Sequence, residues 1–273
     1  MQKVKLGLAQ IKISENFNNN VSKAFMFLEK AKKSNCEIIC FPEQQFLPFF
    51  PQFAKQKKYF KYAISLDNQI VKKFKEKCKT DKIVAVPNFY EKDHENYYDS
   101  SPIIDASGNV LGISRMVHIV QAKHFYEQDY YTPSNTGFKV YNTRYGKIGV
   151  VICFDRHFPE AIRVMTLMGA EIVVIPTANT KGEPLDFFEW ELKIAAYHNQ
   201  VYIAMVNRVG KEADMDFCGE SIIVDPYGNV VKKANDKEQL LTATIDLDLI
   251  KKARNDRPFL RLRQPQWYKR ITE

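Results

Sequence analysis

Hydrophobic and polar positions along the chain follow two patterns. Short apolar runs rich in Val and Ile predict buried strands, and longer stretches with apolar residues at helical spacing predict amphipathic helices. The predicted strands cover residues 4–11, 37–41, 82–90, 110–118, 148–152, 171–176, 201–206, 217–224 and 240–245, with further strands from Asn96 and from Val230. The predicted helices cover residues 18–32, 68–78, 161–168 and 186–199.

Strands and helices alternate along the chain, and hairpin turns at residues 107–109 and 225–229 interrupt this alternation. No Pro/Ser-rich linker, repeat or low-complexity tract divides the chain. We therefore expect a single α/β domain over residues 1–273, with a pair of mixed sheets. The N-terminus enters the first strand without a signal peptide, and no apolar run approaches the ~18–20 residues of a membrane helix. These features predict a cytoplasmic protein that does not contact membranes.

Composition is that of an ordinary globular protein, with 45% hydrophobic and 26% charged residues among 273. The five cysteines are odd in number and irregularly spaced, and none belongs to a Cys-x-x-Cys pair. A disulfide framework and a zinc site are therefore both unsupported, and we expect no metal and no cofactor. Free thiols fit a reducing cytoplasm.

The net charge of +8 raises the question of nucleic-acid binding. The basic residues are spread along the chain, however, and no nucleic-acid-binding motif accompanies their denser patches at 55–61, 72–82 and 251–270. Solvated helix faces explain these patches better, so no nucleic-acid partner is expected. An anionic substrate or an acidic partner stays open.

Candidate chemistry lies at the ends of two buried strands. Cys153 follows the strand at 148–152, and Pro159 and Glu160 then begin a helix, so the thiol is expected to face a helix N-terminus that favours the thiolate. Glu43 follows the strand at 37–41, at the carboxyl end where α/β sheets place their chemistry. The alternatives are a buried, inert Cys153 and a solvated loop glutamate at position 43.

Several short motifs lie in order along nearly the whole chain. They are Phe41-Pro42-Glu43, Tyr126-Glu127, residues 130–141, residues 153–160, Pro176-Thr177-Ala178, residues 207–210, Gly219-Glu220-Ser221 and the Asp225-Pro226 turn. Together they resemble the nitrilase (carbon–nitrogen hydrolase) superfamily, and within it the chain is similar to the N-carbamoyl amidohydrolases that include the N-carbamoylputrescine amidases. The resemblance implies a four-layer αββα sandwich and a homodimer or higher homo-oligomer.

The resemblance implies hydrolysis of a small amide or N-carbamoyl substrate. Cys153 would be the nucleophile and form a thioester, Glu43 would be the general base, and Glu127 would orient the site. The backbone N–H of Phe154 would help to stabilise the oxyanion. The superfamily uses no metal.

One position departs from the family pattern. The family has Arg-Lys-x-His-Ile, in which the lysine completes the oxyanion site, whereas this chain has Arg115-Met116-Val117-His118-Ile119. Methionine carries no charge, and loss of one oxyanion donor typically costs roughly a hundred- to a thousandfold in rate. Three explanations are open. Another cation, Arg115 or Lys123, could replace the lysine; the chain could bind a ligand without turnover; or the methionine could be an introduced substitution that traps a substrate complex.

The residues that we expect to contact substrate follow the same motifs, although several histidines among them fit a core or pocket-wall role equally well. If Arg156 faces the pocket, a carboxylate-bearing substrate is favoured, whereas Asp155 or Glu189 there would favour an amine. The aromatic and basic stretch at 46–63 either lines a pocket or packs as an unusual loop. The predicted substrate-binding residues are Arg115, His118, Asp155, Arg156, His157, Asn179 and Thr180.

Overall fold

The computed structural model describes residues 2–273, and its two large sheets carry most of the buried Val and Ile residues. Within this range, the first sheet has seven strands and the second has six. The first runs in the order β17 (Gln239–Asp246), β1 (Lys3–Gln10), β2 (Ile38–Cys40), β3 (Val84–Val86), β5 (Asn96–Ile104) and β4 (Phe89–Asp93), with β6 (Val110–Arg115) also on β5. The second runs in the order β16 (Val230–Lys233), β15 (Ile222–Val224), β12 (Tyr202–Asn207), β11 (Ile172–Thr177), β10 (Gly146–Val150) and β9 (Val140–Thr143).

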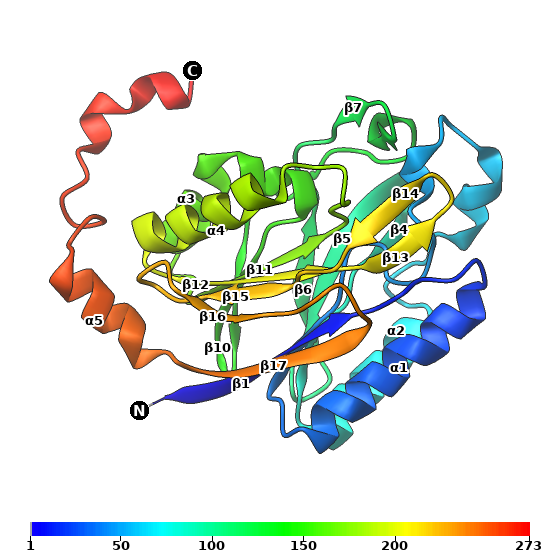
Figure 1. The fold of residues 1–273 in the computed structure, drawn as a ribbon, viewed down its shortest axis with the longest axis horizontal. Helices are drawn as coiled ribbons and strands as arrows, with labels where there is room; N and C mark the ends of the chain where they lie inside the picture. The colour runs from blue at the N-terminus through cyan, green and yellow to red at the C-terminus, as the bar shows by residue number, and fades with distance from the viewer. Residues whose placement is uncertain (1) are drawn as a thin grey trace.

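Helices cover the outer faces of both sheets (Figure 1). The helices α1 (Phe17–Lys33) and α2 (Gln69–Asp81) pack on the first sheet, and α3 (Pro159–Leu167) and α4 (Leu185–Asn199) pack on the second. The inner faces of the two sheets meet in a third apolar core, to which Leu6, Ile38, Ile148 and Val174 contribute. The four-layer αββα sandwich that the resemblance implies is therefore confirmed.

The remaining elements are short. Two hairpins, β7 (Gln121–Ala122) with β8 (Phe125–Tyr126) and β13 (Val209–Glu212) with β14 (Met215–Cys218), lie outside the large sheets. Helix α5 (Asp248–Asp256) leads into residues 258–273, which extend from the sandwich toward the C-terminus (Figure 1). None of the helices in residues 2–273 has the length and apolar character needed to cross a bilayer.

Two predicted strands differ from the structure. The strand expected at 217–224 is interrupted, because Gly219 and Glu220 both have a positive φ, and the chain leaves the β13–β14 hairpin there before it joins the second sheet as β15. The strand expected at 82–90 is likewise two strands, β3 and β4. In each case one apolar run supplies two different pairings, which the periodicity alone does not distinguish.

Parallel pairing aligns the carboxyl ends of the central strands. In the first sheet β1, β2 and β3 are parallel, and in the second β10, β11 and β12 are parallel. Polar residues follow these ends directly: Glu43 lies beyond β2, Cys153 beyond β10, and Asn179 beyond β11. The fold therefore gathers the predicted chemistry at one edge of the sandwich.

Candidate active site

Cys153 lies at a tight turn between strand β10 and helix α3. It is the first residue of the 3-10 helix Cys153–His157, and its φ of +41° is unusual for a residue with a side chain. Gly149 lies four residues earlier, in strand β10. A Cβ atom there would lie 2.6 Å from the Sδ atom of Met165 on helix α3, so strand and helix approach too closely for a larger residue. A strained turn of this kind between a strand and a helix is typical of an exposed nucleophile position.

A cavity of about 230 Å³ lies beside this turn. Six of the residues predicted from the sequence line it: Glu127, Cys153, Phe154, Arg156, His157 and Asn179. They come from three separate segments, two of which follow strands of the second sheet. The cavity has room for a small organic molecule and brings that molecule against the thiol.

Glu43 lies directly beyond β2 and is fully buried. Neither of its carboxylate oxygens has a hydrogen-bond partner within residues 2–273, but Asp99 and the Cys153 thiol lie close enough to influence its charge. Burial, and then the negative charges of Asp99 and Glu127, raise the pKa of Glu43 well above its usual range. A carboxyl whose pKa is raised by its surroundings is typical of general acids and bases.

Glu127 and Asp99 complete a buried group of carboxyls around Glu43. Oε2 of Glu127 accepts a 3.4 Å hydrogen bond from the Val120 N–H, and burial followed by the charge of Asp99 raises its pKa well above the usual range. Burial also raises the pKa of Asp99 to about 6. Burial and a neighbouring negative charge both favour the protonated form of a carboxyl. An ionised Asp99 therefore opposes the ionisation of Glu43 and of Glu127.

Met116 follows strand β6 and is buried. Its side chain belongs to the same apolar cluster as Cys153, and its backbone N–H donates a 3.0 Å hydrogen bond to the carbonyl of Asp99. The backbone at this position therefore adjoins Asp99 of strand β5, and the methionine side chain brings no positive charge. An ammonium group near these carboxyls would favour their ionised forms.

The expectation that the helix N-terminus would favour the thiolate is wrong. Burial raises the pKa of the Cys153 thiol well above its usual range; Glu43 raises it further, Arg156 lowers it, and Glu127 raises it. Five residues, 154–158, separate Cys153 from the start of helix α3, so the helix dipole acts on the thiol only weakly. Desolvation then outweighs the dipole, and the surroundings of Cys153 oppose its ionisation.

Four of the predicted substrate-binding residues do not line the cavity. Arg115 binds Glu91 at 2.6 Å and Asp93 at 2.7 Å. Thr180 lies in the loop after β11, and its hydroxyl lies 3.0 Å from Oε2 of Glu183. The remaining two, His118 and Asp155, bind each other. Of the predicted substrate-binding residues, only Arg156, His157 and Asn179 therefore line the cavity.

Asp155 joins the segment of Met116 to the nucleophile turn. Its carboxylate accepts hydrogen bonds from the backbone N–H of Val117 at 3.1 Å and of His118 at 2.8 Å. The imidazole of His118 binds the same carboxylate at 2.7 Å and stacks on Phe158 with the ring centroids 3.6 Å apart. These contacts fix the position of Met116 relative to Cys153.

The sequence reasoning missed Arg208, which holds the loop of Glu43. Its guanidinium is fully buried, pairs with Glu212 at 2.5 Å, and donates to the carbonyls of Glu43 at 3.2 Å and Leu47 at 2.9 Å. The available signal was its position directly after a buried strand, as for Cys153 and Glu43. Asp99 was also missed, because it lies inside a strand whose sequence gives no sign that this face meets the site.

The aromatic stretch at 46–63 forms a packed loop. It contains the 3-10 helices Phe50–Gln52 and Lys57–Tyr62, and its buried rings join Tyr90, Tyr130 and Tyr131 in one aromatic cluster. Phe50 alone lies within 6.0 Å of Tyr59, Tyr90, Tyr130 and Tyr131. Of the two alternatives for this stretch, packing describes most of it, and the cluster supports the chain on either side of Glu127.

Comparison with known proteins agrees with this geometry. The model of the carbon–nitrogen hydrolase family matches residues 5–255. The chain belongs to the carbon–nitrogen hydrolase family. It is 36% identical over 276 residues to an N-carbamoylputrescine amidase of Arabidopsis thaliana, which covers 95% of this chain and 92% of that protein. It is 33% identical to a citrullinase of Francisella tularensis, over 99% of both chains.

A solved structure extends the comparison to three dimensions. This carbon–nitrogen hydrolase superposes on a carbon–nitrogen hydrolase from Helicobacter pylori with a TM-score of 0.93 and 27% identity, over 99% of this chain and 98% of the other. The family resemblance inferred from the motifs is thus confirmed. The family and the fold are therefore established.

Proposed function

We propose that this carbon–nitrogen hydrolase cleaves a small amide or N-carbamoyl substrate through a thioester on Cys153. The observation that carries the proposal is the position of this thiol: it lies on a strained turn, against a cavity of about 230 Å³, with buried carboxyls beside it. Glu43 is the proposed general base, Glu127 orients the site, and the N–H of Phe154 binds the developing oxyanion. No metal or cofactor takes part in this proposal.

The proposed reaction has two halves. In the first, the Cys153 proton passes to Glu43 while sulfur bonds to the carbonyl carbon; the carbon–nitrogen bond then breaks, and nitrogen leaves with that proton as ammonia or an amine. In the second, Glu43 takes a proton from water, oxygen bonds to the thioester carbon, the sulfur–carbon bond breaks, and sulfur regains the proton. The net change is addition of one water, and the product is an acid or a carbamate.

The residues on the cavity wall bear on the substrate class. Arg156 lines the cavity, whereas Asp155 binds His118 and Glu189 pairs with Lys233 at 3.0 Å. By the argument from the sequence, Arg156 supports a substrate that carries a carboxylate, but its guanidinium is already bound by Asn179 and Glu191, so substrates without a carboxylate belong in the test as well. Glu183 also lines the cavity, so N-carbamoyl amino acids and N-carbamoyl amines, including N-carbamoylputrescine and citrulline, belong in the same test panel.

The test combines ammonia release with intact mass for the panel of carbamoyl compounds and amides. We expect turnover that is lost in Cys153→Ala, and a transient mass increase on wild-type protein that is absent from that variant. Turnover that survives Cys153→Ala would overturn the proposal. A stable ligand complex without any covalent mass or ammonia would favour the alternative, a binding protein on a hydrolase fold whose Met116 prevents turnover.

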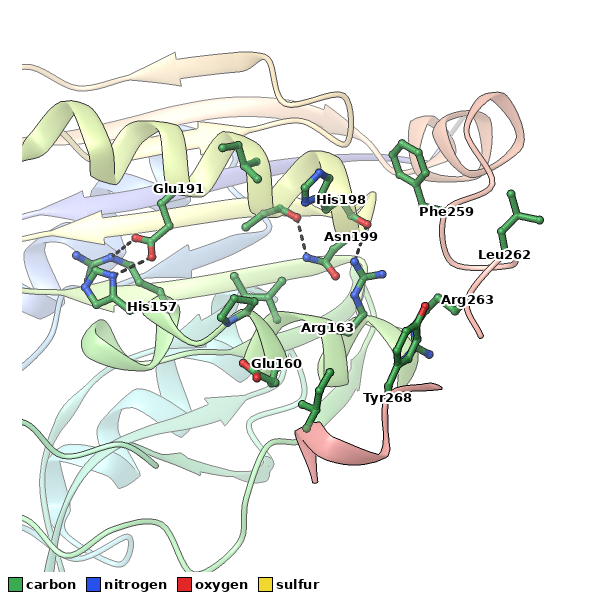
Figure 2. A pocket seen from close by; sticks show the side chains of 16 residues that line it. His157, Glu160, Arg163, Glu191, His198, Asn199, Phe259, Leu262, Arg263 and Tyr268 are labelled. Carbon is green, nitrogen blue, oxygen red and sulfur yellow. Dashed lines mark hydrogen bonds and ion pairs between the residues drawn. The ribbon is translucent and has the colours of Figure 1, made fainter. Parts of the chain in front are cut away.

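We also propose that a second copy of the chain covers the outer face of α3 and α4. A groove of about 570 Å³ lies between these helices and residues 258–273, and Figure 2 displays its lining from His157 to Tyr268. Large apolar side chains that line it are exposed, with Ile194 at 48%, Leu262 at 65% and Ile271 at 59%. Trp190, which also lies on α4, is 61% exposed. Contiguous exposed apolar surface of this kind is typical of an interface.

Sedimentation velocity tests this assembly. We expect Trp190→Glu to shift the protein toward monomer, because the new charge would be buried in the interface. The matched control is Met26→Glu, which changes a methionine that is 40% exposed on α1, on the opposite outer layer. Equal sedimentation of both variants and the wild type would contradict the proposed interface.

A further inference from the structure

Acidic side chains outnumber basic ones among the charged groups that act on the Cys153 thiol. Two carboxyls, Glu43 and Glu127, act on the thiol and oppose its ionisation, and Met116 places no charge against them. Arg156 supplies the positive charge that acts in the other direction. A sulfur that attacks a carbonyl needs its negative charge stabilised, so the position of this guanidinium bears directly on reactivity.

The guanidinium of Arg156 contacts the nucleophile itself. Its Nη1 atom lies 3.9 Å from the Cys153 sulfur and donates a 3.0 Å hydrogen bond to the Cys153 carbonyl. The same nitrogen lies 3.2 Å from the hydroxyl oxygen of Thr177, whose own distance to the sulfur is 3.4 Å. Arginine and threonine thus present two donors to one side of the sulfur.

Further contacts hold this arginine in place. Its Nη2 atom donates to Oδ1 of Asn179 at 2.9 Å, and its guanidinium carbon lies 4.5 Å from the centre of the Phe188 ring. Glu191 approaches Nε at 3.4 Å and also binds His157 at 2.8 Å (Figure 2). The side chain is only 2% exposed, so the charge is fixed in a site with little water and acts on the sulfur with little screening.

The two cations suggested by the sequence are placed differently. Arg115 is bound by Glu91 and Asp93 and lines no part of the cavity, and Lys123 lies exposed on the β7–β8 hairpin. Arg156, three residues beyond the nucleophile in the chain, contacts the sulfur through the turn of the 3-10 helix.

We propose that Arg156 is a catalytic residue whose guanidinium stabilises the negative charge on the Cys153 sulfur, in place of the charge that Met116 does not carry. The inference rests on the proposed role of Cys153 as nucleophile. The guanidinium keeps all its protons throughout: the thiol proton moves to Glu43, and the sulfur electron pair forms the bond to the carbonyl carbon.

Alkylation of Cys153 by iodoacetamide tests the inference without turnover. The reagent is small and uncharged, and it reacts with the thiolate. All five cysteines are buried, but Cys153 is the one that lines the cavity of about 230 Å³, and peptide mapping assigns the alkylated residue. We expect Arg156→Gln to slow alkylation at neutral pH by about tenfold or more, since one pKa unit corresponds to a tenfold change in thiolate. We expect Arg156→Lys to retain most of the rate, and the control Lys123→Gln to be unchanged. Cys153→Ala supplies the blank.

A second pair of variants sharpens the test. If Arg156 and a lysine at position 116 do the same work, Met116→Lys accelerates alkylation more in the Arg156→Gln background than in wild type. Glu191→Gln removes the carboxylate that partly neutralises Arg156, so we expect faster alkylation. If circular dichroism shows that Arg156→Gln is unfolded, Glu191→Gln provides the test instead. Unchanged rates in folded Arg156→Gln, or slower alkylation in Glu191→Gln, would overturn the inference.

The outcome separates this inference from the proposed function. Slow alkylation of Arg156→Gln in a protein that hydrolyses nothing in the panel would support the role of Arg156 and reject the hydrolase proposal. If turnover depends on Cys153 but Arg156→Gln leaves the alkylation rate unaltered, the hydrolase proposal is supported and the role of Arg156 is rejected.

Discussion

The Nδ1 atom of His118 lies 2.7 Å from Oδ1 of Asp155, and this contact joins the segment that carries Met116 to the turn that carries Cys153. Asp155 is buried, whereas the His118 side chain is about one third exposed. The pair therefore acts at the boundary between solvent and site. The backbone N–H groups of Val117 and His118 donate to the same carboxylate. These hydrogen bonds would remain if the imidazole were removed.

Replacement of His118 by phenylalanine is expected to keep the stack on Phe158 and remove the hydrogen bond to Asp155. We expect the free energy of unfolding to fall by about 1 kcal/mol, and kcat to fall because the site loses its fixed spacing. Asp155→Ala leaves several donors unpaired and should cost about 3 kcal/mol. Urea unfolding compares the two variants, and an equal loss in both would show that the backbone donors contribute nothing.

Substitution of Asp99 by asparagine is expected to move the acid limb of the pH–rate profile to lower pH. The negative charge of Asp99 helps to raise the pKa of Glu43, and Glu43 works as a base only after it loses its proton, so activity rises as pH rises through that pKa. Without the charge the limb shifts down. An unmoved limb in Asp99→Asn, with the exposed Asp236→Asn as control, would show that the two carboxyls are not coupled.

The same substitution should flatten the dependence of stability on pH. The pKa of Asp99 is raised from 3.8 to about 6 on folding, chiefly by burial, so the folded state binds this proton more tightly. Its contribution to stability is therefore complete below the unfolded pKa and is lost as pH rises through about 6. Thermal unfolding of Asp99→Asn should show a smaller decline of Tm with pH across this window than the wild type.

Arg208 provides a test of the loop that positions Glu43. Arg208→Met leaves the buried carboxylate of Glu212 without its partner, and we expect a loss of about 3–5 kcal/mol in the free energy of unfolding. The double variant Arg208→Met/Glu212→Leu removes both charges and should recover part of this loss. A double-mutant cycle in urea measures the coupling, and simple additivity would contradict the pairing.

Gly149 tests the close approach of β10 to α3. An added Cβ atom would meet Met165 at 2.6 Å, and overpacking of this kind costs about 1–3 kcal/mol. The control is Gly182→Ala, where the nearest atom lies 3.9 Å away in an exposed loop. Chemical unfolding should separate the two variants; equal stability would mean that the helix moves aside without cost.

The amino-acid sequence alone was enough to predict many of the elements and two chemical positions. Periodicity placed the first helix at 18–32, where the structure has α1 at Phe17–Lys33, because a buried apolar stripe determines both pattern and helix. Polar residues directly after buried strands identified Glu43 and Cys153, since parallel strands end at one edge of a sheet. The break at 219–221 was not predictable, because the pairing partners of β14 and β15 lie in different sheets.

Tertiary structure decided the electrostatics of the site. The sequence indicated a thiolate at Cys153 and suggested Arg115 or Lys123 as a replacement for the family lysine at the position of Met116. Folding buries the thiol beside carboxyls, and both effects raise its pKa. Arg115 instead pairs with Glu91 and Asp93, and the guanidinium of Arg156 lies beside the sulfur. Charge interactions depend on distance and on exclusion of water, and both are set by packing between segments that are remote in sequence.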